Sequence, residues 1–318
     1  MMERPMKHES PPNSLDSLDS PAKLNTRAGL VAIIGRPNVG KSTLMNALVG
    51  EKIAIVSDKP QTTRRRITGI LTRPEGQAVL VDTPGIHKPG YRLNRRMMIA
   101  TTQALTSVDA VLLVVDATMA PGPGDRFAIS MLKQTPAPAF LVPNKIDAVT
   151  TKSDLLPLIG RYAAEKEFKE VVPISARTHD GLELLIQKIF EYLPEGPPLY
   201  PEDALTDQPE RILAAELVRE KILQVAQEEI PYVTAVVTER WEESEGITRI
   251  HCIIYVERPS ERPIIIGKGG ARLKEIGSAA RADIEALLGR HVFLGLFVKV
   301  REHWRNDDRT LNELGIEG

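Results

Sequence analysis

One eight-residue stretch constrains the fold more than any other feature of the chain, and it is Gly35-Arg36-Pro37-Asn38-Val39-Gly40-Lys41-Ser42. An apolar run ends at Ile34, and a helix-like segment begins at Thr43. The glycines of G-x-x-x-x-G-K-S allow a tight backbone wrap whose N–H groups face phosphates at the positive end of the following helix. Lys41 would reach the β- and γ-phosphates, and Ser42 would hold Mg²⁺. A plain strand-to-helix turn is the alternative, but the complete match in its expected setting favours a nucleoside triphosphate site that includes Thr43.

The composition narrows the class of protein. The chain has 318 residues, 42% of them hydrophobic, which predicts about two domains with ordinary cores. The single cysteine, Cys252, excludes an internal disulfide and any multi-cysteine metal site, and its alternating apolar neighbours predict a core position. The six histidines show no metal-ligand spacing. Because the sequence has no membrane-length apolar run and no signal-peptide pattern, we expect a cytoplasmic protein.

Changes in composition divide the chain into segments. Residues 1–26 are polar and rich in proline and predict a disordered tail. Strand-like and helix-like segments alternate over 27–193, which is typical of an α/β domain with a mixed, mostly parallel sheet and helices on both faces. The proline-rich segment 194–206 is a predicted linker, and residues 207–305 predict a smaller α+β domain. We expect 306–318 to be a C-terminal tail.

Apolar periodicity predicts the elements of both domains. In the first domain we expect strands at 29–34, 66–72, 77–82, 109–116, 138–143 and 171–174, with helices near 42–49, 92–106, 123–134, 151–168 and 180–192. In the second we expect a helical stripe over 212–225, strands at 232–239 and 248–256, a glycine loop at 267–270, a helix over 273–288 and a strand at 292–300.

Polar residues follow the predicted strands, where ligands bind in sheets of this kind. After the third strand comes Asp82-Thr83-Pro84-Gly85. We expect Asp82 to reach Mg²⁺ and the Gly85 N–H to sense a γ-phosphate.

Two further motifs address the base. Asn144-Lys145-Ile146-Asp147 follows the fifth strand, and a carboxylate there can accept from the N1–H and the 2-amino group of guanine, a donor pair that adenine lacks. Ser175-Ala176-Arg177 follows the sixth strand and suits a backbone N–H offered to the guanine O6. GTP is therefore the predicted nucleotide, and an ATP-dependent motor is disfavoured.

Together these four motifs resemble those of the translation-factor-like GTPases. Gln61-Thr62-Thr63-Arg64-Arg65-Arg66 is similar to the first switch of that family. The resemblance implies that Thr63 closes over Mg²⁺ and the γ-phosphate, although the adjacent Thr62 leaves the register open. A solvated loop is the alternative for Arg64–Arg66, and we assign these arginines no role.

Ile86 departs from the Ras-type enzymes, which carry a water-orienting glutamine after the same motif. Isoleucine can neither donate nor accept a hydrogen bond, so slow intrinsic hydrolysis is expected. The sequence resembles the subclass with a hydrophobic residue here, in which an asparagine at the position of Asn38 supports a K⁺ ion in place of an arginine finger; a loop-capping role for this side chain is the alternative. We expect Lys41, Thr63, Gly85 and Asn38 to serve hydrolysis.

The element order of the second domain resembles the prokaryotic-type (type 2) KH domain, whose G-x-x-G loop clamps the backbone of about four nucleotides. Between Arg258 and Arg305, ten lysines and arginines outnumber five acidic residues. A plain helix-to-helix turn is the alternative for the loop. The residues expected to contact RNA are the loop and its basic neighbours, namely Arg262, Gly267, Lys268, Gly269, Gly270, Arg272 and Lys274.

A GTPase of this subclass followed by a KH domain resembles the Era family over about residues 28–305. The resemblance implies a GTP-hydrolysing assembly factor of the small ribosomal subunit that binds small-subunit rRNA near its 3′ end, with the GTP and GDP states controlling binding and release. It also implies Mg²⁺ and K⁺ as cofactors and peripheral association with the inner membrane, for which the sequence shows no anchor. We expect a monomer. The alternative function is an RNA-binding module in which GTP is a regulatory ligand with negligible turnover.

Overall fold

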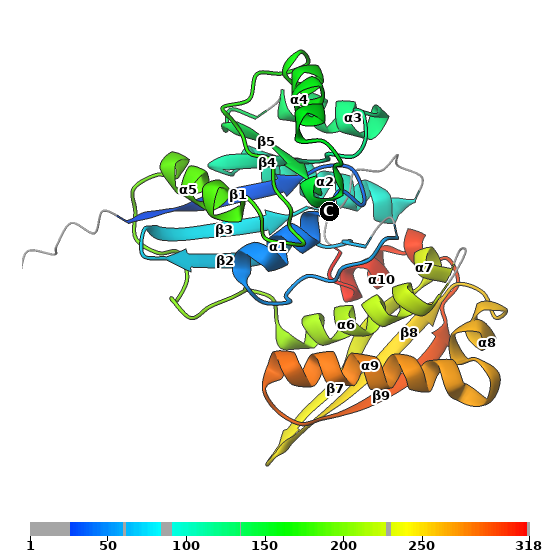
Figure 1. The fold of residues 1–318 in the computed structure, drawn as a ribbon. Helices are drawn as coiled ribbons and strands as arrows, with labels where there is room; N and C mark the ends of the chain where they lie inside the picture. The colour runs from blue at the N-terminus through cyan, green and yellow to red at the C-terminus, as the bar shows by residue number, and fades with distance from the viewer. Residues whose placement is uncertain (1–25, 60–61, 84–90, 134, 227–229, 317–318) are drawn as a thin grey trace, which may run out of the picture.

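The structure is a computed structural model of the chain and describes residues 26–59, 62–83, 91–133, 135–226 and 230–316. The predictions for the N-terminal tail before residue 26 and for Gln61, Pro84, Gly85 and Ile86 lie outside these residues. Two domains lie against each other, each built on its own sheet (Figure 1). Among the helices described, none is both long enough and apolar enough to cross a membrane.

The N-terminal domain is built on a six-stranded sheet, as far as the described residues go. Its strands are β1 (Arg27–Ile34), β2 (Ile67–Arg73), β3 (Gly76–Asp82), β4 (Ala110–Asp116), β5 (Ala139–Asn144) and β6 (Glu170–Val171). The strand order is β2-β3-β1-β4-β5-β6, and only the β2–β3 pair is antiparallel. Strands β3, β4 and β5 are buried along their whole length, as strands covered on both faces should be. The predicted mixed, mostly parallel sheet is confirmed.

Helices cover both faces of this sheet. Buried side chains of α1 (Lys41–Val49) and α5 (Leu182–Tyr192) pack on one face. Those of α2 (Arg92–Thr106), α3 (Pro123–Leu132) and α4 (Leu155–Ala163) pack on the other. The carboxyl ends of the parallel strands therefore open together beside the N-terminus of α1, where the predicted motifs lie.

The C-terminal domain places two long helices on one face of a three-stranded sheet (Figure 1). The order is α6 (Glu210–Val225), α7 (Ile230–Val233), β7 (Ala235–Ser244), β8 (Ile247–Val256), α8 (Glu261–Ile266), α9 (Ala271–Leu288) and β9 (Val292–Val300). β7 and β8 are antiparallel, and β8 and β9 are parallel. The buried faces of α6 and α9 cover the sheet, so the predicted KH order of elements is confirmed. Cys252 is buried in this core, and burial raises the pKa of its thiol to about 11.

Three predicted elements differ in extent. The strand expected from residue 232 starts at Ala235, because the preceding carbonyls accept hydrogen bonds from an arginine of the other domain. The helix expected over 151–168 is confined to α4, with a 3₁₀ turn before it. The sixth strand is short, because Pro143 on its neighbour has no N–H to return to the ladder.

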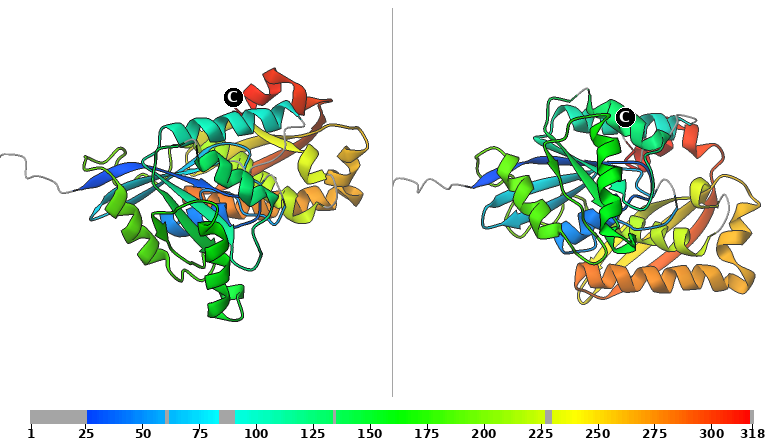
Figure 2. Two further views of the ribbon diagram at one scale, coloured as in Figure 1. Left: turned by 90° about the horizontal axis from the view of Figure 1, so that it is seen from above. Right: turned by 45° about the horizontal axis from the view of Figure 1, so that its top comes forward.

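The C-terminal segment differs most from prediction. Instead of a tail, it forms a 3₁₀ turn at Trp304–Asn306 and the helix α10 (Asp308–Glu313), which lies beside α2 (Figure 2). Its apolar side chains are buried with those of α2 and β7. Arg96 of α2 donates to the carbonyl oxygen of Ile316 (2.7 Å) and pairs with Asp308 (2.8 Å). The segment thus joins the two domains.

Replacing Leu311 with alanine should lower the free energy of unfolding by about 2–5 kcal/mol, because the side chain is fully buried and leaves a cavity between the domains. Leu156→Ala is the matched control, since Leu156 is 71% exposed and its loss should cost less than about 0.5 kcal/mol. Urea denaturation followed by circular dichroism measures both. Equal midpoints for the two variants would contradict the packing described for α10.

Candidate functional site

The P-loop, residues 35–42, turns sharply between β1 and α1. Gly35 has a φ of 152°, and a Cβ there would lie 2.3 Å from the Val114 carbonyl oxygen. Gly40 has a φ of 96°, and a Cβ there would lie 2.3 Å from Nδ2 of Asn144. Both positions therefore require glycine, and the loop can wrap closely with its N–H groups at the start of α1.

Lys41 lies inside this wrap. Its Nζ donates to the carbonyl oxygens of Gly35 and Arg36, both at 3.1 Å, and the side chain is buried. Burial lowers the pKa of Lys41, and the negative charge of Asp82 acts in the opposite direction. The loop thus holds a desolvated cation. Phosphate oxygens would compete with the two carbonyl oxygens for the hydrogen bonds that Lys41 donates.

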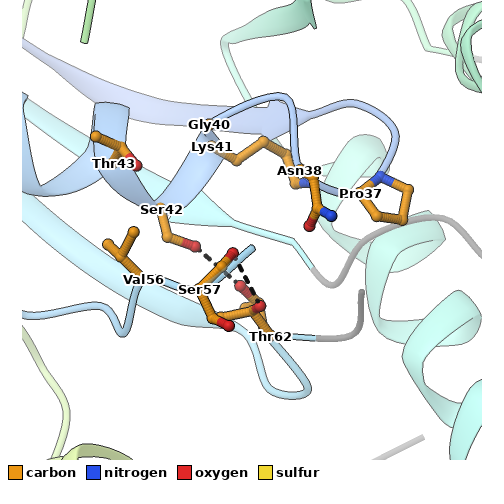
Figure 3. A pocket seen from close by; sticks show the side chains of 10 residues that line it. Pro37, Asn38, Gly40, Lys41, Ser42, Thr43, Val56, Ser57 and Thr62 are labelled. Atoms are coloured by element: carbon orange, nitrogen blue, oxygen red, sulfur yellow. Dashed lines mark hydrogen bonds between the residues drawn. The ribbon is translucent and has the colours of Figure 1, made fainter. Parts of the chain in front are cut away.

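A pocket lies between the P-loop and the side chains of Val56, Ser57, Thr62 and Thr63 (Figure 3). Three side-chain oxygens converge next to it, beside the lysine. Ser42 Oγ lies 3.0 Å from Thr63 Oγ1 and 3.0 Å from Asp82 Oδ2, and Thr63 Oγ1 lies 3.1 Å from Asp82 Oδ2. Octahedral Mg²⁺ with bonds of about 2.1 Å holds neighbouring oxygen ligands about 3.0 Å apart. The residues present therefore fit Mg²⁺.

The carboxylate of this trio is itself in an environment that suits a cation. Asp82 is fully buried, and its Oδ1 has no hydrogen-bond partner among the described residues. Burial raises the pKa of Asp82, and a divalent ion at this point would lower it again. Thr62 does not compete for the position, because its hydroxyl donates to the carbonyl oxygen of Lys59 (2.6 Å). The geometry favours Thr63 in the register that the sequence left open.

Asn38 lies at the edge of the pocket in a left-handed conformation, with a φ of 64°. Its Nδ2 donates to the carbonyl oxygen of Asp58 at 2.5 Å, which ties the P-loop to the segment before the switch. This contact corresponds to the loop-capping alternative for Asn38.

Asn144 holds three loops together. Its Nδ2 donates to the carbonyl oxygen of Val39 (2.8 Å), and its Oδ1 accepts from the backbone N–H groups of Lys145 (2.8 Å) and Ala176 (2.9 Å). The P-loop and the segments after β5 and β6 are thereby fixed relative to one another.

Asp147 is an exposed residue of this region, although its side chain is only 14% exposed. It accepts from the hydroxyl of Ser175 and pairs with the guanidinium of Arg177. The hydrogen bond from Ser175 lowers the pKa of Asp147, and Arg177 adds to the effect, so the group is charged at neutral pH. A charged carboxylate can accept from two neighbouring donors of a base, which would take the place of Ser175 and Arg177 as its partners.

The structure brings to the site two carboxylates that the sequence analysis missed, Asp116 and Asp125, each beside a residue that it predicted. Lys145 Nζ donates to Asp116 Oδ2 (2.7 Å) and to the carbonyl oxygen of Asn38 (2.8 Å), and Arg36 lies 3.3 Å from Asp125. Asp116 is the last residue of the apolar strand β4, so the strand-end rule that found Asp82 would have found it too. Asp125 carries no comparable signal.

The glycine loop of the C-terminal domain joins α8 to α9. Gly267, Gly269 and Gly270 all have positive φ, and a Cβ at Gly267 would lie 2.8 Å from the Cβ of Arg272. Lys268 is exposed, and a Cβ at Gly269 would meet nothing within 4 Å. The loop therefore offers bare backbone and one cation to the outside.

The basic neighbours of this loop divide into two kinds. Arg262 and Lys274 are exposed, whereas Arg272 donates to the carbonyl oxygen of Ile264 (2.7 Å) and so braces the loop. A groove runs from the loop between α9 and β9, and its lining includes Gly270, Lys274, Gly277, Ser278, Arg281, Phe293 and Leu296. The sequence analysis missed the far end of this groove. A glycine inside a helix, at 277, was the available signal.

Comparisons with known proteins address both domains. The family described as "50S ribosome-binding GTPase" matches residues 30–145, and the KH domain family matches residues 229–305. GTPase Era of Heliobacterium modesticaldum is 49% identical over 292 residues, covering 92% of this chain and 97% of that protein. GTPase Era of Geobacter metallireducens is 51% identical over 291 residues, covering 91% and 97%.

Two solved structures match almost the whole chain. One is a variant of Aquifex aeolicus Era bound to GDP·AlF4⁻, and the other is Era in complex with MgGDPNP and nucleotides 1506–1542 of 16S ribosomal RNA. Each has a TM-score of 0.89 and 41% identity, and covers 92% of this chain and 100% of the solved chain. The similarity therefore extends over both domains and the way they are joined.

Changing Asp147 to asparagine should lower the preference for GTP over xanthosine triphosphate by roughly 100-fold or more, because the amide oxygen can no longer accept both guanine donors. Competition binding of the two nucleotides measures the ratio. Arg177→Ala is the control, since it removes the partner of Asp147 but keeps the carboxylate. An unchanged ratio in the asparagine variant would show that Asp147 does not read the base.

Proposed function

The chain belongs to the Era family of GTPases, and from this premise we propose that it binds small-subunit ribosomal RNA near its 3′ end and times binding and release by hydrolysing GTP during assembly of the small subunit. The carrying observation is the match over both domains to Era in complex with MgGDPNP and 16S ribosomal RNA. Membership of a GTPase family argues against the alternative in which GTP is a ligand with negligible turnover.

In the nucleotide site, each residue has a role that its contacts support. Lys41 would exchange its two carbonyl partners for the β- and γ-phosphates, and Ser42, Thr63 and Asp82 would hold Mg²⁺. When bound, Mg²⁺ neutralises negative charge that develops on the phosphates. Thr63 must stay in place for the ion to be fully ligated, which makes its segment the part of the chain that distinguishes GTP from GDP.

At the other end of the nucleotide, the base is read by Asp147. Its carboxylate accepts the two guanine donors, and a backbone N–H of Ser175-Ala176-Arg177 meets the guanine O6. Asn144 belongs to the same predicted nucleotide site and joins the loops around it. Gly85 would sense the γ-phosphate by resemblance.

The groove of the C-terminal domain is the proposed RNA site. Its loop presents backbone and Lys268, and the exposed cations Lys274 and Arg281 line the groove. Arg262 is exposed on α8, the helix that leads into the loop. Backbone phosphates would approach the glycines, and single-stranded bases would lie between α9 and β9. A monomer in the cytoplasm, with peripheral association at the inner membrane, belongs to the proposal by family resemblance alone.

Potassium stimulation through Asn38 is a further part of the proposal. Asn38→Ala should remove any stimulation of GTP hydrolysis by K⁺ while leaving GTP affinity within about threefold, because the side chain would orient the ion beside the transferred phosphoryl group. Hydrolysis rates in matched NaCl and KCl buffers test this. Equal rates for the unmodified chain in the two salts would remove K⁺ from the mechanism.

Replacing Lys268 and Gly269 together with aspartate should abolish RNA binding without changing GTP affinity, because two carboxylates would repel phosphates at the loop. The control is Lys152→Asp with Gly160→Asp, which changes the net charge equally at exposed positions in the other domain. Filter binding with 3′-terminal small-subunit RNA and a scrambled RNA, at two salt concentrations, measures the effect. If both double variants bind the native RNA equally well, the loop is only a turn.

A further inference from the structure

Arg64 directly follows Thr63, yet its side chain lies in the other domain. It donates to the backbone carbonyl oxygens of Thr234 (2.6 Å), Pro231 (3.0 Å) and Tyr232 (3.1 Å). Only 4% of the residue is exposed, and its guanidinium lies 5.5 Å from the ring centroid of Trp304. The arginine therefore lies in a buried site of the C-terminal domain. We call this site, formed by the three carbonyl oxygens and the Trp304 ring, the Arg64 receptor.

This receptor is rigid. Trp304 is fully buried and donates through Nε1 to the carbonyl oxygen of Val233 (2.8 Å), so the ring and the carbonyls that receive Arg64 are fixed to each other. The ring also belongs to the apolar cluster that joins α10 to α2. Movement of Arg64 would leave a buried cation without its acceptors, which is costly.

A second contact holds the same stretch from the other side. Arg219 of α6 donates to the carbonyl oxygen of Thr62 and is itself paired with Glu216. Thr63 lies between these two anchored residues and points toward Ser42 and Asp82. The backbone on each side of the threonine is thus held by the C-terminal domain.

We propose that Arg64 is a positioning residue for GTP hydrolysis, through which the C-terminal domain holds Thr63 at the Mg²⁺ position. This inference rests on the proposed role of Thr63 as an Mg²⁺ ligand and requires no RNA. The KH domain then supplies part of the geometry of the nucleotide site in addition to its own groove. Neither the motif containing Thr63 nor the KH fold by itself contains this connection.

The test uses the full chain without RNA and compares Arg64→Ala with Arg66→Ala, because Arg66 is exposed and lies two residues away. Arg64→Ala should lower kcat roughly 10- to 100-fold through misplacement of Thr63. It should weaken binding of a non-hydrolysable GTP analogue at limiting Mg²⁺ by about fivefold or more, and leave GDP affinity within about twofold. Arg66→Ala should match the unmodified chain.

Arg64→Lys provides a variant that keeps charge and most of the volume. Lysine cannot reproduce the planar fork that meets three carbonyls, so kcat and analogue affinity should fall between those of the unmodified chain and Arg64→Ala. In both Arg64→Ala and Arg64→Lys, binding of the GTP analogue should depend more strongly on the Mg²⁺ concentration while GDP binding stays normal. This combination separates a positioning role from a loss of folded structure.

Trp304 offers a readout that does not depend on activity. In a Trp241→Phe background it is the remaining tryptophan of the chain. Its fluorescence should differ between the GDP and the Mg²⁺–GTP-analogue states, and Arg64→Ala should abolish that difference. Persistence of the full difference in Arg64→Ala would overturn the proposal.

Thr63→Ala separates this inference from the proposed function. If Thr63→Ala hydrolyses GTP at the unmodified rate, the proposed role of Thr63 fails. If Thr63→Ala loses hydrolysis but Arg64→Ala does not, only the positioning role fails. Equal loss of GDP and GTP-analogue binding in Arg64→Ala would also overturn it, because a general structural defect would then explain the result.

Discussion

The shared carboxyl edge of the parallel strands is the constraint on which the rest of the structure depends. Because β1, β3, β4 and β5 all end there, short polar motifs far apart in sequence meet at one place. Asn144 shows how tightly they meet, since one amide spans the P-loop and the segments after β5 and β6. A buried amide satisfied in this way has a single orientation, so the loops around the nucleotide are fixed before any ligand arrives.

The contact between the domains follows a different rule, because it is built on buried charge. Burial lowers the pKa of Arg64 to about 9, with Arg219 adding to the effect, yet the guanidinium remains charged at neutral pH. Burial alone would raise the pKa of Glu216, but Arg219 lowers it overall. Buried charged groups such as Arg64, Arg219 and Glu216 are stable only when all their partners are in place. The interface therefore either forms in one well-defined arrangement or does not form. An interface with a single arrangement can couple the position of Thr63 to the position of the C-terminal domain.

The sequence could predict the motifs at the strand ends, but it could not predict the contact between the domains. The P-loop, Asp82 and Asp147 are found from short motifs whose chemistry is local, and the alternation of elements predicts both folds. The role of Arg64 could not be found, because three consecutive arginines resemble a solvated loop until the other domain is placed against them. The same contact moves the start of β7, and the burial of Leu311 against α2 turns an apparent tail into a helix. These misses are contacts between domains, which no window of sequence contains, whereas Asp125 and the short β6 were missed for reasons within one domain.

The position of Arg64 has a thermodynamic consequence for the RNA site. If closure of Thr63 over Mg²⁺ requires the Arg64 receptor, then GTP binding favours the arrangement of the C-terminal domain seen here. Linkage is reciprocal: whatever factor GTP contributes to the affinity for RNA, RNA must contribute to the affinity for GTP. The groove between α9 and β9 lies in the same domain as the carbonyls that receive Arg64, and the core beneath α6 and α9 is continuous between them. A ligand that binds only one arrangement of the domains therefore acts on Thr63 without contacting it. The coupling free energy between the ligand and Thr63 can be no larger than the difference in the binding free energy of the ligand for the two arrangements.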